Sequence, residues 1–225
     1  MKQVLVFDVN ETLLDVRALA PYFEHAFSDV EVLSQWFAQL LQIAFVVTLT
    51  DSYRDFGTCA RHALDVVAQK RGRTLAQADR DAILSGILHL PPHPEVAESL
   101  AQLKEAGFRL ATLTNSAPNV LEAQLNNSGL ATYFERMLSV DAVGKFKPDP
   151  ATYHMAASEL SATTNQLRLI AAHNWDTTGA IRAGCRAAFV ARPGMVLGPL
   201  DEKPDIIGHD LTEVVTQIMQ VDQPL

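Results

Sequence analysis

Residues 4–12 have the sequence VLVFDVNET. The first four residues are apolar and mostly branched, a pattern typical of a parallel strand that is buried on both faces. Asp8 follows this run directly, and Thr12 comes four residues after Asp8. Parallel sheets bind ligands outside the carboxyl ends of their strands, so Asp8 is the first candidate for a functional residue. An aspartate in this place is more often a turn or capping residue, so Asp8 alone does not identify a site.

Strands and helices alternate in the rest of the chain. Further buried strands are predicted from apolar runs at residues 110–113, 167–171 and 187–191, with a weaker run at 205–207. Helical spacing lies between them, at residues 97–106, 119–128, 150–160 and 177–183. Gly107, Gly129 and Gly184 follow three of these helices, where a left-handed residue is expected. The alternation predicts an α/β fold with a Rossmann-like parallel sheet and helices on both faces.

Residues 14–94 interrupt this alternation. They contain helical patterns at 32–44, 57–69 and 76–88 and no convincing strand, and they end in the stiff sequence Pro91-Pro92-His93-Pro94. About eighty residues of helix are more than is needed to cover one face of the sheet. We therefore predict a core domain of residues 1–13 and 95–225, with an all-helical cap domain inserted at 14–94.

Composition limits the classes of partner. The chain has 225 residues, of which 48% are hydrophobic and 20% charged, and its net charge is -8. This charge argues against nucleic-acid binding, which requires a basic surface. Cys59 and Cys185 have neither metal nor redox spacing, and we expect no export signal, because the apolar run at residues 4–7 is short and ends at Asp8. The apolar stretch from Phe37 to Leu49 is too short to span a bilayer. We expect a cytoplasmic protein without a membrane partner.

Polar side chains follow the later strands as well. Thr114 and Asn115 come after the run at 110–113, Lys147 precedes the helix at 150–160, and Asp176 follows the run at 167–171. Taken singly, these are ordinary helix caps and a surface lysine. Together with Asp8 they form a set of four that should converge at one edge of the sheet, which favours a catalytic site.

These residues identify a family. Asp8 with Thr12 resembles the first motif of the haloacid dehalogenase superfamily, and the other three motifs are similar to Leu113-Thr114-Asn115, Lys147-Pro148-Asp149, and Asp176 with Gly179-Ala180. The resemblance covers the whole chain, including a helical cap after the first motif. It implies a hydrolase in which Asp8 attacks the substrate and forms a covalent ester.

Two positions separate the reactions that this superfamily catalyses. Magnesium-dependent phosphatases of the family carry an acid two residues after the nucleophile and a carboxylate four residues before the Asp176 position. Here these residues are Asn10 and Ala172, so both a proton donor and a metal ligand are missing. Halide leaves without a proton, and a monoanionic acid can be balanced by a lysine. The sequence therefore favours an enzyme similar to the type II (S)-2-haloacid dehalogenases, without a metal or other cofactor.

The resemblance also implies roles for the motif residues. Lys147 should keep Asp8 ionised and Thr12 should orient it, while Thr114 and Asn115 are suited to the carboxylate of a small carboxylic acid substrate. Asp176 is the candidate that positions or deprotonates the water that attacks the ester, and His173 is the second candidate base. A histidine satisfied by hydrogen bonds beside the sheet is an equally good interpretation of His173.

Other positions depart from the type II pattern. The arginine that usually faces the halide from the cap is Phe37 here, and Asn10 replaces an aromatic residue. The further residues expected to line the substrate pocket are Tyr153, Asn174 and Trp175. These departures leave open a related hydrolase acting on another 2-substituted or strained-ring carboxylic acid, a magnesium-dependent phosphatase, or a non-catalytic interaction protein. A homodimer is expected from the resemblance.

Overall fold

A parallel sheet forms one lobe of the computed structural model, which describes residues 2–225. The strand order is β3-β2-β1-β4-β5-β6, all pairs are parallel, and the short β7 pairs with β1. The strand bounds are β1 (Lys2–Phe7), β2 (Arg109–Thr114), β3 (Arg136–Ser139), β4 (Leu167–Ala171), β5 (Arg186–Val190), β6 (Ile206–Gly208) and β7 (Gln223–Pro224). The predicted parallel α/β sheet is confirmed.

Two strands were not predicted, and both lack an apolar run. In β3, at the edge of the sheet, Arg136 is exposed and Met137 is 40% exposed, so only half of this strand carries the signal of burial. β7 is two residues long and contains Pro224, which has no N–H to give to a ladder. β3 pairs with β2, and β7 pairs with the first two residues of β1. These pairings cannot be predicted from the residues of β3 or β7 alone.

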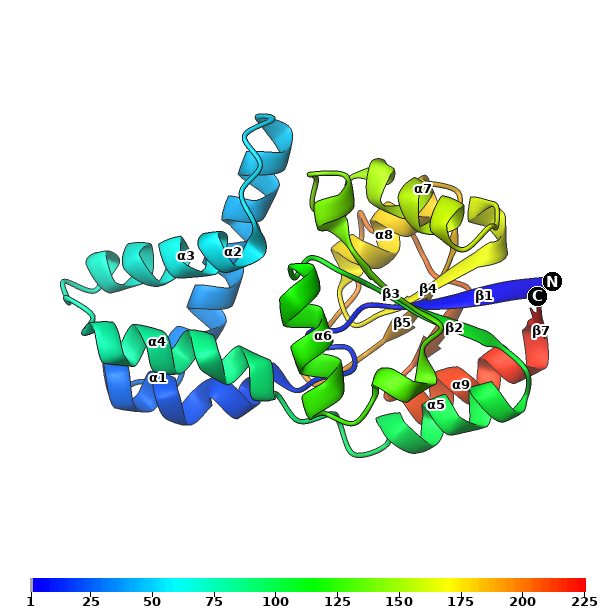
Figure 1. The fold of residues 1–225 in the computed structure, drawn as a ribbon, viewed down its shortest axis with the longest axis horizontal. Helices are drawn as coiled ribbons and strands as arrows, with labels where there is room; N and C mark the ends of the chain where they lie inside the picture. Colours follow the sequence, from blue (N-terminus) through cyan, green and yellow to red (C-terminus); the bar gives the residue numbers. More distant parts are fainter. Residues whose placement is uncertain (1) are drawn as a thin grey trace.

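Helices cover both faces of the sheet (Figure 1). α5 (Val96–Glu105) and α9 (Leu211–Val221) pack together on one side, and α7 (Pro150–Glu159) and α8 (Asn174–Arg182) pack on the other. α6 (Pro118–Asn127) follows β2. Gly107, Gly129 and Gly184 have φ of +84°, +74° and +90°, so the predicted left-handed helix ends are confirmed.

In the sheet lobe, the helices differ from the prediction at α8 and α9. α8 begins at Asn174 and not at residue 177, because backbone N–H groups of Asp176 and Thr177 already bond to the carbonyl of His173. The sequence analysis also gave no helix after residue 205, where α9 buries Leu211, Val214 and Ile218. Asp176 therefore lies in the first turn of a helix and not in front of it.

Helices without a strand form a second lobe beside the sheet (Figure 1). It contains η1 (Val16–Leu19), α1 (Ala20–Phe27), α2 (Val32–Leu49), α3 (Phe56–Lys70), α4 (Gln77–Gly86) and η2 (Ile87–His89). The chain enters and leaves this lobe side by side, since Leu14 bridges Pro92 and the N–H of His93 donates to the carbonyl of Leu13 at 2.9 Å. The exact domain boundaries, after residues 13 and 94, stay a prediction.

α2 is longer than the sequence indicated. It continues past Ala44 to Leu49, and its 18 residues have a mean hydropathy of 1.6. By length and composition alone, the expectation that this stretch is too short to cross a membrane is wrong. In the structure α2 packs on α3, and the indole Nε1 of the buried Trp36 donates to the carbonyl of Ala60 at 3.0 Å. Its apolar character is thus partly explained by the core of the helical lobe.

Candidate active site

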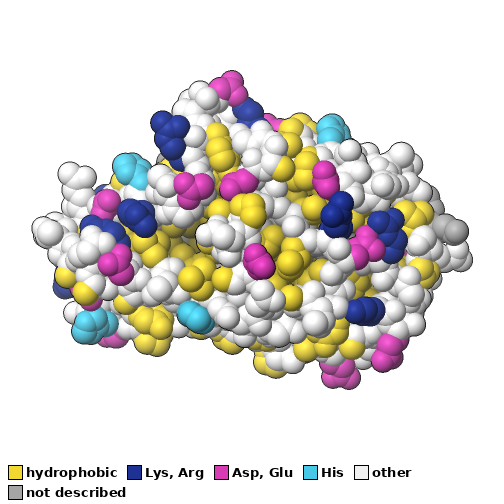
Figure 2. All heavy atoms as spheres, in the orientation of Figure 1, with side chains coloured by type: hydrophobic (Ala, Val, Ile, Leu, Met, Phe, Trp, Pro, Cys, Tyr) yellow, Lys and Arg dark blue, Asp and Glu magenta, His cyan; other side chains and the backbone are white. Residues whose placement is uncertain are grey.

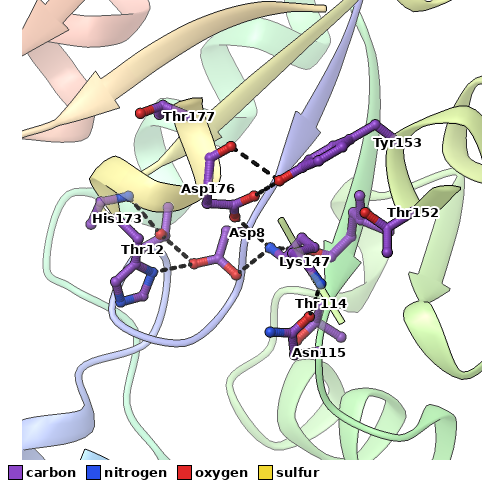
Figure 3. A network of polar contacts seen from close by, with 12 residues as sticks. Asp8, Thr12, Thr114, Asn115, Lys147, Thr152, Tyr153, His173, Asp176 and Thr177 are labelled. Carbon is purple, nitrogen blue, oxygen red and sulfur yellow. Dashed lines mark hydrogen bonds and ion pairs between the residues drawn. The ribbon is translucent and has the colours of Figure 1, made fainter. Parts of the chain in front are cut away.

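The polar residues after the strands meet at the carboxyl edge of the sheet (Figure 3). Asp8 follows β1, and its N–H donates to the carbonyl of Ile170 in β4 at 3.0 Å, which fixes its backbone between the two central strands. Only 5% of Asp8 is exposed. The structure brings Asp8, Thr12, Lys147 and Asp176 into one network of polar contacts.

Both carboxylate oxygens of Asp8 are held by donors. Lys147 Nζ donates to Oδ1 at 2.9 Å, and the Thr12 hydroxyl donates to Oδ2 at 2.7 Å. Thr12 in turn accepts the N–H of Ala172 at 2.9 Å, so its hydroxyl is itself oriented. Burial alone raises the pKa of Asp8, but Lys147 and His173 outweigh it and hold that pKa well below its usual value. Asp8 is therefore an ionised, aligned carboxylate at neutral pH.

Lys147 is fully buried and makes three contacts through its ammonium group. Besides Asp8, it donates to Asp176 Oδ2 at 2.5 Å and to the carbonyl of Leu113 at 2.9 Å. Its backbone N–H donates to Asn115 Oδ1 at 3.0 Å, which ties the segment after β2 to residues 143–149, the lysine loop. Burial lowers the pKa of Lys147, but Asp176 and Asp8 outweigh it and raise that pKa. A permanent cation thus lies beside Asp8.

Asp176 is enclosed on all sides. Its Oδ2 accepts from Lys147, and its Oδ1 accepts from the hydroxyl of the buried Tyr153 at 2.7 Å. Burial raises the pKa of Asp176, while Lys147 opposes that rise. A side chain on Gly179 would come within 2.4 Å of Pro148 Cβ, which shows how closely α8 lies against the lysine loop. Tyr153 holds Asp176, and Asp176 holds Lys147. Because both residues are closed off from solvent, their geometry suits positioning better than activation of water.

His173 lies on the other side of Asp8, and its partner is a residue that the sequence analysis did not select. The imidazole Nε2 is 2.7 Å from Glu11 Oε2, and Nδ1 is 3.3 Å from Asp8 Oδ2. Burial lowers the pKa of His173, but Asp8 and Glu11 outweigh it and raise that pKa to about 9. The distance to Asp8 is too long for a strong hydrogen bond, so we regard this contact as an ion pair. His173 is protonated at neutral pH while Asp8 is charged.

Glu11 is held in an unusual backbone conformation. Its φ is +63°, in the left-handed region that non-glycine residues seldom adopt. The contact between Glu11 and His173 could have been suspected from the sequence, because an acidic residue lies between Asp8 and Thr12 and a histidine follows β4. The two segments are 162 residues apart, and only the pairing of β1 with β4 brings them together.

Aromatic rings surround His173. Its imidazole stacks on Trp175 with ring centres 4.9 Å apart and on Phe37 at 6.0 Å, and Phe45 meets the edge of Trp175. Phe37 and Phe45 belong to α2, so the helical lobe contacts the site through this stack. The structure thus places two predicted pocket residues, Phe37 and Trp175, against the imidazole.

The amide and hydroxyl side chains are mostly engaged by the protein. Asn10 donates to Ser116 Oγ at 3.2 Å and accepts from Gln124 Nε2 at 2.9 Å. Thr114 Oγ1 accepts the N–H of Ser116 at 3.2 Å. Asn174 instead donates to Asp201 at 2.8 Å, in the loop after β5, so the structure does not bring its side chain into the Asp8 network. The predicted pocket residues are thus divided between the site and its surroundings.

Comparisons with known proteins agree with this geometry. The family model of the haloacid dehalogenase-like hydrolases matches residues 2–184. The chain belongs to this family. A similar relative is an (S)-2-haloacid dehalogenase of Pseudomonas sp. (strain YL), 30% identical over 203 residues, which are 89% of this chain and 88% of the relative.

Solved structures of the family have the same fold. The L-2-haloacid dehalogenase of Xanthobacter autotrophicus aligns with a TM-score of 0.91 at 27% identity, over 98% of this chain and 99% of that one. The same enzyme with chloropropionic acid covalently bound aligns with a TM-score of 0.91 at 26% identity, over 98% and 99% of the two chains.

The residues of this family member do not fit the magnesium ion of the family's phosphatases. The oxygens of Asp8 already face the ammonium of Lys147 and the imidazole of His173, and Ala172 offers no side-chain oxygen. Within residues 2–225, no group of three His, Cys, Asp or Glu side chains is placed to share a metal ion. The chemistry of the site therefore has to be derived from protein side chains.

Proposed function

We propose that this protein hydrolyses (S)-2-haloalkanoic acids to 2-hydroxy acids through an ester on Asp8. The observation that carries the proposal is the state of Asp8: a buried, ionised carboxylate between two cations, with an amide at residue 10 in the place of a proton donor. Such a site favours a leaving group that departs as a stable anion. The haloacid dehalogenases among its relatives support this assignment.

In the first step an oxygen of Asp8 attacks C2 of the acid. The C2–halogen bond breaks with its electron pair, halide departs, and an ester forms with inversion at C2. Lys147 keeps the attacking oxygen charged, and Thr12 fixes its direction. Thr114, Asn115 and the N-terminal turn of α6 lie beside the site and are suited to the substrate carboxylate.

In the second step water attacks the ester carbon of Asp8, and we assign its activation to His173 held by Glu11. Esterification removes the charge of Asp8, one of the two causes that raise the pKa of His173, so the imidazole releases its proton to solvent. It then accepts a proton from water and passes it to the departing hydroxyl oxygen of the product. The other proton of that water remains on the Asp8 carboxyl, which gives it to the imidazole and so restores the ion pair of the free enzyme. Asp176 is fully buried and bonded to Lys147 and Tyr153, so we give it the positioning role.

The proposed function is tested by halide release from (S)-2-chloropropionate with EDTA present. We expect the wild type to release chloride and Asp8→Asn to lose the activity by about 10⁴-fold or more, since the nucleophile is replaced. The neutral isostere should remain folded, which circular dichroism checks. Chloride release by Asp8→Asn at the wild-type rate, or none from folded wild type, would contradict the proposal.

The assignment of the second step is tested by Glu11→Gln. Removal of one carboxylate partner lowers the pKa of His173 in the free enzyme and leaves the imidazole without its orienting anion, so we expect kcat to fall about 10²-fold. The ester on Asp8 should then accumulate, which mass spectrometry of the quenched enzyme detects as the added mass of the acid. A fall in kcat without accumulated ester would assign Glu11 to the first step.

A second candidate is a hydrolase that displaces a group other than halide from C2. Phe37 favours it, because this ring lies against His173 at the position where the type II pattern has an arginine for the halide. It predicts that a strained-ring or other 2-substituted acid is consumed through the same Asp8 ester while 2-chloropropionate is not.

A further inference from the structure

A mostly apolar cavity of about 110 Å³ lies between the helical lobe and α6. Phe37, Leu40 and Ala60 line it from α2 and α3, while Asn10, Ser116 and Val120 line it from the sheet lobe. On the face drawn in Figure 2, hydrophobic side chains are recessed between the two lobes. The interior of the cavity can exclude water from an apolar group.

This cavity begins beside the nucleophile. Asn10 lies two residues after Asp8, and its side chain is fixed by Ser116 and Gln124. Phe37, on the opposite wall, stacks on His173, whose Nδ1 is 3.3 Å from Asp8. Asp8 itself is not part of the wall, so a substrate held at Asp8 would extend into the cavity rather than lie within it.

We infer that the cavity receives an apolar substituent on C2, so that the preferred substrates are medium-chain 2-haloalkanoic acids and not 2-halopropionates. This inference rests on the proposed function and names its substrate class. An apolar protein cavity of about 150 Å³ holds a benzene ring, so a cavity of this size accommodates a chain of about four carbons. A methyl group on C2 would leave most of it empty.

The charges around the cavity favour an apolar substituent over a second carboxylate. Among the lining residues in the described part of the chain, Arg61 alone is charged, and it is exposed. A distal carboxylate inside the cavity would therefore lose its hydration without gaining a buried partner.

The test separates binding from turnover. The Asp8→Asn variant is titrated calorimetrically with (S)-2-chlorohexanoate and (S)-2-chloropropionate, which differ by three methylene groups. Each methylene removed from water is worth about a factor of four, so we expect the longer acid to bind at least about tenfold more tightly. A ratio of dissociation constants below about threefold would overturn the inference.

Two substitutions test whether this cavity is responsible. Ala60→Leu fills it from α3, and Val120→Phe fills it from α6, each in the Asp8→Asn background. Both should reduce the ratio of dissociation constants to below about threefold, because the space for the chain is removed. His62→Leu, which adds the same side chain at an exposed position of α3, should keep the ratio. An unchanged ratio in both filled variants, shown by circular dichroism to be folded, would place the chain elsewhere.

Halide release by the wild-type protein decides the proposed function separately. If the wild type releases chloride from 2-chloropropionate but does not bind the longer acid more tightly, the dehalogenase proposal stands. The inference that the cavity receives the C2 substituent would then be refuted. Tight binding of the longer acid without halide release from either compound would refute the dehalogenase proposal and, with it, the assignment of a haloacid to the cavity.

Discussion

Two buried cations lie at opposite ends of the strands, and each binds two carboxylates. Arg168, near the start of β4, donates through Nε to Asp222 at 2.5 Å and through Nη1 to Asp205 at 2.5 Å. Lys147, at the carboxyl end, binds Asp8 and Asp176. The composition of the two clusters is nearly the same, but their surroundings are not.

The Arg168 cluster is saturated. Its guanidinium also donates to the carbonyl of Ala187 at 3.0 Å, and both carboxylates belong to the last part of the chain, which they fasten to the sheet. Arg186 is a second cation of this cluster, 3.3 Å from Asp205. In the Lys147 cluster the second cation is His173, which contacts Asp8 and belongs to the aromatic stack. Asp8 is thus an ionised carboxylate beside the aromatic stack, whereas Asp205 and Asp222 hold the last part of the chain on the sheet.

The largest effect should follow removal of the cation at the carboxyl end. In Lys147→Met, Asp8 and Asp176 lose their shared partner, so the pKa of Asp8 rises and the nucleophile loses its electrostatic support. We expect halide release to fall by about 10³-fold or more. The control is Lys104→Met, which removes an exposed lysine of α5 that bonds to the carbonyl of Thr132. Near-normal activity in Lys147→Met would show that the two clusters do not differ in function.

At the other end of the strands, replacing the buried cation Arg168 by methionine should lower stability and leave catalysis nearly unchanged. In Arg168→Met, Asp222 remains fully buried without its main partner, and we expect the free energy of unfolding to fall by about 3–5 kcal/mol. Activity of the folded fraction should stay within about threefold of wild type. The matched control is Arg182→Met on α8, whose ion pair with Glu202 is exposed and should contribute less than about 1 kcal/mol. Urea unfolding and halide release, measured on the same samples, make the comparison.

The smallest expected effect concerns the second cation of the reactive cluster and depends on pH. The pKa of His173 is raised from its usual 6.5 to about 9 in the folded protein. The resulting stabilisation is complete below pH 6.5 and is lost as the pH rises through 9, because the unfolded histidine is then already neutral. A shift of this size corresponds to at most about 3.5 kcal/mol.

Urea unfolding at pH 6 and pH 9.5, in wild type and His173→Gln, isolates this contribution from other groups. We expect wild type to lose more stability over this interval than His173→Gln does. An equal loss in both proteins would mean that His173 is neutral beside Asp8, and the assignment of its proton would have to be revised.

The central strands were predictable because each is buried on both faces and carries its own apolar run. The predicted run at 167–171 coincides with β4, whose residues are all buried. β3 was not predicted because half of it is exposed at the sheet edge. α2 was predicted to end at residue 44 and continues to Leu49. The residues of one segment indicate whether that segment is buried. They do not indicate which other segment pairs with it or packs against it.

The motif residues of the site follow from the sequence in the same way. Asp8, Thr12, Lys147 and Asp176 come at strand ends or beside them, and the parallel sheet brings strand ends together. The sequence by itself thus determined the fold class, the family and the ionised carboxylate at the centre of the site.

The tertiary structure alone decided three features: the contact between Glu11 and His173, the enclosure of Asp176, and the cavity between the helical lobe and α6. Glu11 faces His173 only because β1 pairs with β4 and because the backbone at Glu11 is left-handed. The proton affinity of His173 depends on two charges, those of Asp8 and Glu11, which lie far from His173 along the chain. Electrostatic interactions and cavity volumes depend on distances through space, and these distances cannot be read from the spacing of residues along the chain.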